Sequence, residues 1–175
     1  MRWKKRLFWV SALLGLGADQ LTKFWVLRNF ELAETRPFIS RVLNLTYVQN
    51  RGAAFGLCED CLWLPWLSAL VCIALLSLGI WGPRLTRWEQ AGYGFLLGGA
   101  AGNGLDRILL AYVVDFLQLP WLYFPKFMFT GGSIQLRWQL FPVFNIADIC
   151  INVGLICLLI ATWQSSRKKP RKPLV

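Results

Sequence analysis

Hydrophobic residues in this 175-residue chain gather in four long runs. The runs cover approximately residues 7–27, 62–81, 91–112 and 143–163, and charged residues, prolines or glycines bound each of them. About 20 helical residues cross the hydrocarbon core of a bilayer, so each run is long enough to span a membrane. We therefore predict an all-α membrane protein, in which four transmembrane helices form a single domain over residues 1–175.

Basic residues at the two ends of the chain account for much of its net charge of +10. They precede the first run and follow the fourth: Arg2, Lys4, Lys5, Arg6, Arg167, Lys168, Lys169, Arg171 and Lys172. The positive-inside rule then predicts that both termini are cytoplasmic, which requires an even number of spans. The two long loops, 28–61 and 113–142, consequently face outward, and the charge does not indicate a nucleic-acid partner.

The first outer loop contains a segment that favours β-structure. Residues 42–48 are rich in β-branched and aromatic side chains, and Asn50-Arg51-Gly52 follows as a turn signal. This pattern predicts a short strand and a small extracytoplasmic sheet. Small residues over 52–56 permit the backbone to approach a ligand or a neighbouring helix closely.

The third run combines glycines with a polar end. The glycines recur at a four-residue spacing: Gly94, Gly98 and Gly102. This spacing predicts close helix packing within the membrane. Asn103, Asp106 and Arg107 follow on one helix face, where the guanidinium can pair with Asp106 or with a lipid phosphate. We interpret Asp106 as an ion-pair partner and Arg107 as a ligand contact.

The first run carries two charges of opposite sign. Asp19 and Lys23 are separated by four positions and therefore share a helix face near the outer leaflet. They are interpreted either as an ion pair that lowers the cost of both charges or as direct substrate contacts, and the two roles are compatible.

Two further aspartates lie at the outer ends of the last two runs. Asp115 follows the third run among apolar neighbours that disfavour ionisation, and Asp148 occupies the outer part of the fourth run. Asn145, Asp148 and Asn152 have helical spacing, which predicts a polar face that points into the bundle. Since an acid in a bilayer is costly, both aspartates are functional candidates that meet if the third and fourth helices are neighbours.

The chain has no histidine, which restricts its chemistry. A Ser-His-Asp triad, a Cys-His pair and an HExxH zinc site are excluded. A Ser-Lys dyad through Lys23 is conceivable, although Asp19 is the natural partner of that lysine. A carboxylate pair remains: the charged member takes a proton from water while the neutral member polarises a peptide carbonyl. This aspartic-protease chemistry requires neither a metal nor a cofactor.

Three other classes of function compete. Cys58 and Cys61 form a CxxC pair that suits a membrane thiol oxidoreductase, but such an enzyme needs a second outer cysteine pair that this sequence lacks. A local disulfide or no function is the simpler interpretation, and Cys72, Cys150 and Cys157 fall within the runs as small hydrophobes. A transporter is disfavoured because the charges cluster at one leaflet. A non-catalytic scaffold would tolerate Asp115→Asn.

Five motifs follow one another along the chain: 19–23 DQLTK, 50–56 NRGAAFG, 102–107 GNGLDR, 113–116 VVDF and 144–148 FNIAD. In these motifs the chain resembles the bacterial lipoprotein signal peptidases, the type II signal peptidases, over nearly its whole length. The resemblance implies a multi-pass aspartic endopeptidase of the bacterial inner membrane with its active site toward the outer face. It also implies cleavage of prolipoproteins before a diacylglyceryl-modified cysteine.

The resemblance assigns roles to specific residues. It implies that Asp115 and Asp148 form the catalytic dyad. Substrate-binding or supporting roles fall to eight others: Asp19, Lys23, Asn50, Gly52, Asn103, Asp106, Arg107 and Asn145. The implied partners are the prolipoproteins, membrane phospholipid and the inhibitor globomycin, and we expect a monomer because one copy holds every part of the site.

The segment between the aspartates departs from the family pattern. The segment 118–141 is longer than expected and carries aromatic side chains that include Trp121, Tyr123, Phe124, Phe127 and Phe129. They are interpreted either as an interfacial belt or as a lid over the site, and we favour the belt.

Overall fold

The computed structural model describes residues 5–52, 61, 63–120 and 142–168. The described chain folds into four helices: α1 (Arg6–Asn29), α2 (Leu64–Trp81), α3 (Arg87–Leu110) and α4 (Ile146–Lys168). Three strands complete it: β1 (Thr35–Ile39), β2 (Leu43–Asn50) and β3 (Val113–Gln118). The four hydrophobic runs thus coincide with four helices, whose ends differ from the predicted limits by a few residues.

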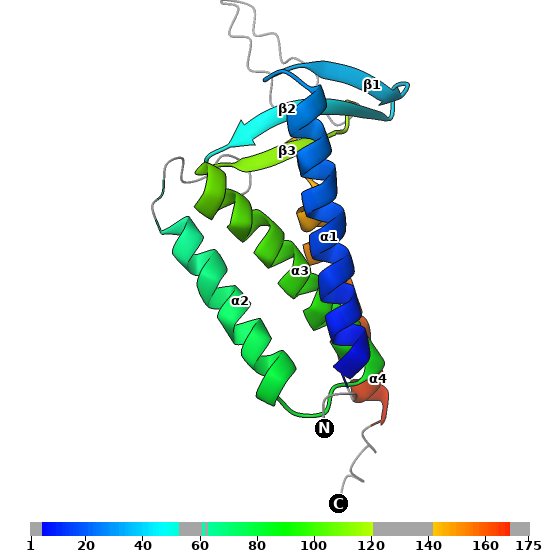
Figure 1. The fold of residues 1–175 in the computed structure, drawn as a ribbon. Helices are drawn as coiled ribbons and strands as arrows, with labels where there is room; N and C mark the ends of the chain where they lie inside the picture. Colours follow the sequence, from blue (N-terminus) through cyan, green and yellow to red (C-terminus); the bar gives the residue numbers. More distant parts are fainter. Residues whose placement is uncertain (1–4, 53–60, 62, 121–141, 169–175) are drawn as a thin grey trace, which may run out of the picture.

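The sheet lies across one end of the helix bundle, where α1 and α3 finish and where α2 and α4 begin (Figure 1). We call this the sheet end of the bundle, and the other the opposite end. The strand order is β1-β2-β3 and both pairings are antiparallel. The predicted strand at 42–48 is confirmed as β2, whereas β1 and β3 were not predicted.

The end of α3 determines where Asp115 lies. The helix begins at a capping box in which the Thr86 hydroxyl accepts the Glu89 N–H and the Glu89 carboxylate accepts the Thr86 N–H. It ends at Ala111, whose left-handed backbone (φ 65°) turns the chain. Asp115 is therefore carried by β3, opposite Val48 of β2, and not by the third helix.

Close backbone packing holds α3 between α1 and α4. Three glycines of α3 face α1: Gly94, Gly98 and Gly102. A Cβ atom on them would collide with the Phe8 carbonyl, the Ala12 carbonyl and the Asp19 carboxylate respectively. On the other side of α3, a Cβ on Gly99 would collide with the Ala147 carbonyl of α4. The small-residue pattern therefore does predict a close helix interface.

Two apolar clusters occupy the two ends of the bundle. One joins α1 to the sheet through residues that include Val26, Tyr47 and Val114. The other, at the opposite end, is centred on Phe8, Ala12 and Leu97. The buried aspartates and the buried lysine of the described chain lie at the sheet end of the bundle: Asp19, Lys23, Asp106 and Asp115.

Within the described residues, two helices are long and apolar enough to cross a membrane by length and composition: Leu64–Trp81 of α2 and Ile146–Arg167 of α4. The helices α1 and α3 have 24 residues each but contain more charge. Three predictions lie outside the described residues: the aromatic segment 121–141, the small residues 53–56, and Cys58 of the CxxC pair.

Candidate functional site

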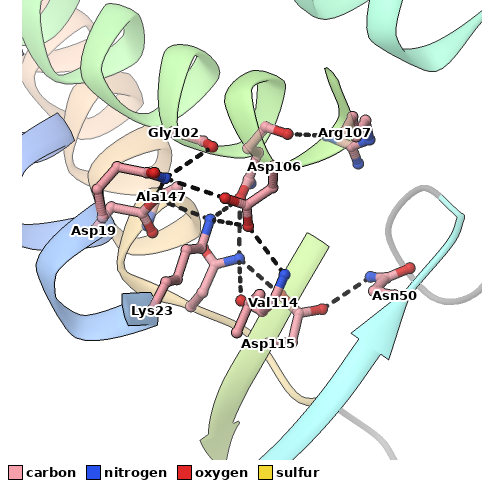
Figure 2. Close-up of polar contacts among 12 residues, drawn as sticks. Asp19, Lys23, Asn50, Gly102, Asp106, Arg107, Val114, Asp115 and Ala147 are labelled. Atoms are coloured by element: carbon pink, nitrogen blue, oxygen red, sulfur yellow. Dashed lines mark hydrogen bonds and ion pairs between the residues drawn. The ribbon is translucent and has the colours of Figure 1, made fainter. Parts of the chain in front are cut away.

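A buried lysine joins two carboxylates at the sheet end. The Lys23 ammonium lies 2.9 Å from Asp19 Oδ2 and 2.9 Å from Asp106 Oδ2. It also donates to Asn103 Oδ1 at 2.9 Å. All four side chains are buried, and Asp19 is fully inaccessible. The predicted ion pair within α1 is therefore present, and Asp106 of α3 extends it to a triad (Figure 2).

The ion-pair partner that we expected for Asp106 on its own helix is replaced by Lys23. Arg107 instead donates to the Gly52 carbonyl at 3.2 Å and to the Asn103 carbonyl at 3.3 Å. One acceptor lies in α3 and the other follows β2, so the guanidinium holds the backbone of residue 52 against the end of α3.

Two asparagines connect this triad to the candidate aspartates. Asn103 accepts from Lys23 and from Asn145 Nδ2, at 3.0 Å for the latter, and donates to Asp148 Oδ1 at 2.9 Å. Asn145 Nδ2 in turn donates to Asp115 Oδ1 at 2.7 Å. The fully buried Asn145 side chain therefore contacts a residue of α3 and a residue of β3 at once.

Asp115 lies on β3, and its carboxyl group accepts hydrogen bonds from two side-chain amides. Its Oδ2 accepts from Asn50 Nδ2 at 2.9 Å, and its Oδ1 accepts from Asn145. Asn50 itself is fixed because its Oδ1 accepts the Gly52 N–H at 3.0 Å. The carboxyl group is 3 % exposed, which leaves little water to stabilise a charge.

Asp148 lies in the first turn of α4 and bonds to the residue that caps this helix. Its Oδ2 accepts the Asn145 N–H at 3.1 Å, and Asn145 Oδ1 accepts the Asp148 N–H at 3.1 Å. These reciprocal bonds are those of a capping box, with Asn145 as the helix cap. Asp148 therefore lies at the positive end of the helix dipole, which favours a negative charge.

The two candidate aspartates thus share Asn145, which bonds to one through its side chain and to the other through its backbone. Burial raises the pKa of Asp115 to about 7; the hydrogen bond from Asn50 opposes that rise, and the negative charge of Asp148 adds to it. At pH values below about 7, Asp115 therefore holds a proton.

A cleft of about 390 Å³ lies beside this pair. It is lined by Asn50 at the end of β2 and Arg51 after it, by Leu64 at the start of α2, and by Arg107 and Tyr112 near the end of α3. The Tyr47 hydroxyl and burial raise the pKa of Tyr112 to about 12. The lining is therefore cationic through Arg51 and Arg107, and it reaches Asp115 through Asn50 without including either aspartate.

Sequence reasoning missed one polar side chain of this network and misplaced another. Gln20 Nε2 donates to Asp19 Oδ2, the Gly102 carbonyl and Asp106 Oδ1 at 3.1–3.2 Å. Its position beside Asp19 was the available signal, but helical spacing does not reveal a partner on another helix. Asn152 was predicted to point into the bundle and is instead exposed, and its amide donates to the Asp148 carbonyl of its own helix.

Every other site residue predicted from the sequence joins this network or its immediate border. Among the described residues, no group of three or more His, Cys, Asp or Glu side chains is arranged to hold a metal ion. Cys61 is disulfide-bonded, and Cys72, Cys150 and Cys157 are free thiols.

Comparison with known proteins decides the family. The family model described as signal peptidase (SPase) II matches residues 11–164. The chain belongs to the signal peptidase II family. A signal peptidase is a protease, so the buried polar network around Lys23, Asn103 and Asn145 belongs to a member of a protease family.

Similar proteins cover nearly all of this signal peptidase II chain. It is 60 % identical to the lipoprotein signal peptidase of Acaryochloris marina and 49 % identical to that of a Cyanothece species. The first alignment covers 98 % of both chains, and the second covers 99 % of this chain and 94 % of the relative. A bacterial membrane enzyme solved by the in meso method at 2.3 Å is 28 % identical, with a TM-score of 0.74 over 94 % of this chain and 93 % of that one.

Proposed function

We propose that this chain is a lipoprotein signal peptidase that removes the signal peptide from prolipoproteins, cleaving before a diacylglyceryl-modified cysteine. Its membership of the signal peptidase II family and its 60 % identity to a lipoprotein signal peptidase support the substrate class. A lipid anchor on the substrate would hold the scissile bond at the membrane surface, near the sheet end of the bundle.

We assign the chemistry to Asp115 and Asp148, and the observation that carries this assignment is their common partner Asn145. Asp148, at the α4 N-terminus, is the ionised member and takes a proton from the attacking water. Asp115 holds a proton and donates it toward the carbonyl oxygen of the scissile bond. Hydrolysis then gives a carboxylic acid and a free amine, and the water supplies the atoms of both new ends.

The neighbouring polar residues would orient this dyad and its substrate. Asn50, Asn103 and Asn145 fix the carboxyl oxygens through hydrogen bonds of 2.7–3.1 Å. Arg107 and Gly52 border the cleft side of the site, where a peptide backbone offers carbonyl groups to a guanidinium.

We further propose that all four helices span the bacterial inner membrane, with both termini in the cytoplasm and the sheet end facing outward. Large apolar side chains are exposed on every helix, for example Leu13, Leu70, Leu109 and Leu159, each more than 60 % exposed. Such surfaces suit contact with phospholipid tails. The protein acts as a monomer, because one chain contributes every residue of the proposed site. As the family resemblance implies, globomycin inhibits it.

The test is cleavage of a diacylglyceryl-modified prolipoprotein by the purified protein in detergent, with a chelator present throughout. Wild type should cleave, and Asp115→Asn and Asp148→Asn should each lose about 1,000-fold or more in turnover. Asn152→Ala serves as the matched control because Asn152 is exposed and donates to the backbone carbonyl of Asp148, not to its carboxylate.

The outcomes separate the competing functions. Loss in both aspartate variants with an active control supports a metal-independent aspartic peptidase. Full activity in either aspartate variant would overturn the dyad. An inactive but folded wild type would overturn the peptidase assignment and favour the scaffold.

A further inference from the structure

The ion triad, defined as Asp19, Lys23 and Asp106, does more than pair charges inside the bundle. Each carboxylate also accepts a backbone N–H from another element. Asp106 Oδ2 accepts the Val114 N–H at 3.0 Å, and Asp19 Oδ1 accepts the Ala147 N–H at 2.9 Å. Both contacts are drawn in Figure 2.

These two amides have corresponding positions in the chain. Val114 directly precedes Asp115 on β3, and Ala147 directly precedes Asp148 in the first turn of α4. The two residues are 0 % exposed, so water cannot replace the lost acceptor without opening the structure. The backbone that carries each candidate catalytic aspartate therefore depends on one carboxylate of the ion triad.

Lys23 connects the two carboxylates. Its single ammonium lies 2.9 Å from each carboxylate, so it fixes their separation across α1 and α3. Gly102 contributes by having no side chain, because a Cβ there would collide with the Asp19 carboxylate. We propose that the ion triad is a positioning device that fixes the backbone of Asp115 through Asp106 and the backbone of Asp148 through Asp19.

This inference rests on the proposed function, because only that function makes Asp115 and Asp148 catalytic. What it states about the structure is that each carboxylate of the ion triad fixes one backbone segment and not the other. A triad that only joins helices would affect both backbone segments alike when either carboxylate is removed. A positioning device of this geometry makes Asp106 specific for the β3 segment and Asp19 specific for the α4 segment.

The experiment is hydrogen exchange resolved to single amides in detergent, comparing wild type with Asp106→Ala and Asp19→Ala. We expect Asp106→Ala to speed exchange at Val114 about tenfold or more, while Ala147 stays within about threefold of wild type. Asp19→Ala should give the reverse pattern. Gln20→Ala is the matched control, because it removes a side-chain donor to both carboxylates and leaves both carboxylates in place to accept the backbone N–H groups.

The asparagine variants provide a second test where the alanine variants fail to fold. In Asp106→Asn an amide oxygen can still accept the Val114 N–H, so exchange there should exceed that of wild type by less than about tenfold, while Ala147 is unchanged. In the peptidase assay, each alanine variant should lower kcat about tenfold or more and leave KM within about twofold, since neither carboxylate contacts the cleft.

The outcomes distinguish this inference from the proposed function. Equal acceleration at both amides in each variant, or none, would overturn the positioning device even if the dyad is correct. Full turnover of Asp115→Asn would overturn the dyad, and the crossed exchange pattern would still report on the ion triad. A crossed pattern together with a selective fall in kcat supports both.

Discussion

The two ends of the same helix bundle are held together in different ways. At the sheet end, buried charges and amides join α1, α3, α4 and β3 through hydrogen bonds. At the opposite end, Phe8, Ala12 and Leu97 pack against one another, and glycines let the backbones touch. If the bundle spans a membrane as proposed, lipid tails are as apolar as these side chains, so the opposite end would depend on close contact and not on exclusion of water.

The two ends therefore differ in the energetic cost of the groups that they bury. Buried charges are costly unless they are paired, and an all-apolar sheet end would pack without that cost. The polar network is confined to the end where the candidate aspartates lie, which is the pattern expected when polarity serves chemistry and position. The comparison predicts its largest difference in stability for variants in which a lysine is removed from one end or the other.

Lys23→Met should destabilise the protein by about 3–5 kcal/mol, because Asp19 and Asp106 would remain buried without their counter-charge. The matched change is Lys5→Met at the opposite end, where the half-buried ammonium donates to the Leu78 and Gly82 carbonyls at 2.6 and 2.8 Å. That change should cost about 1 kcal/mol. Thermal unfolding in detergent measures both, and equal losses would contradict the contrast between the ends.

Gly94→Ala tests the packing at the opposite end. Its new methyl group would collide with the Phe8 carbonyl and lie 2.8 Å from Ser11 Cβ, so a loss of about 1–3 kcal/mol is expected. Gly17→Ala is the control, since nothing lies within 4 Å of a Cβ there. That variant should be neutral or up to about 1 kcal/mol more stable, through higher helix propensity. A stable Gly94→Ala variant would show that α1 and α3 are not in close contact.

The smallest expected effect is a pH dependence that belongs to the sheet end alone. The folded pKa of Asp115, about 7, lies above its ordinary value of 3.8, so the protonated form prevails at lower pH and is lost as pH rises through 7. Turnover should fall about twofold between pH 6 and pH 7 and more steeply above. Lys5→Met should keep this profile; a profile that is flat across pH 6–8 would contradict a protonated Asp115.

The same protonation acts on stability with a defined sign. Because the folded state binds the Asp115 proton more tightly than the unfolded chain does, this group's stabilising contribution is complete below about pH 4. The contribution is lost as pH rises through about 7. The pH range of declining activity therefore overlaps the range in which this carboxyl weakens the fold.

Local sequence patterns predicted the elements whose cause is local. Hydrophobic runs located α1 to α4, β-branched residues located β2, and a four-residue spacing predicted both the Asp19–Lys23 pair and the glycine interface. The prediction for Asn152 was wrong, because helical spacing places residues on a common face but does not say where a wide face meets its neighbour.

The remaining site depended on contacts between segments far apart in the chain. The strand β3 forms because Ala111 ends α3 and β2 supplies a pairing edge, and neither is visible in the short segment around Asp115. Gln20 and the two backbone amides before the aspartates likewise gain their partners from other elements.

The sequence by itself determined the helices, the family motifs and the set of polar residues available for chemistry, because these follow from local spacing and residue type. Tertiary structure alone decided that Lys23 also bonds to Asp106 and that Asn145 joins Asp115 to Asp148. The physical reason is that a buried polar group must find a partner wherever the fold brings one within hydrogen-bond reach, whatever their separation along the chain.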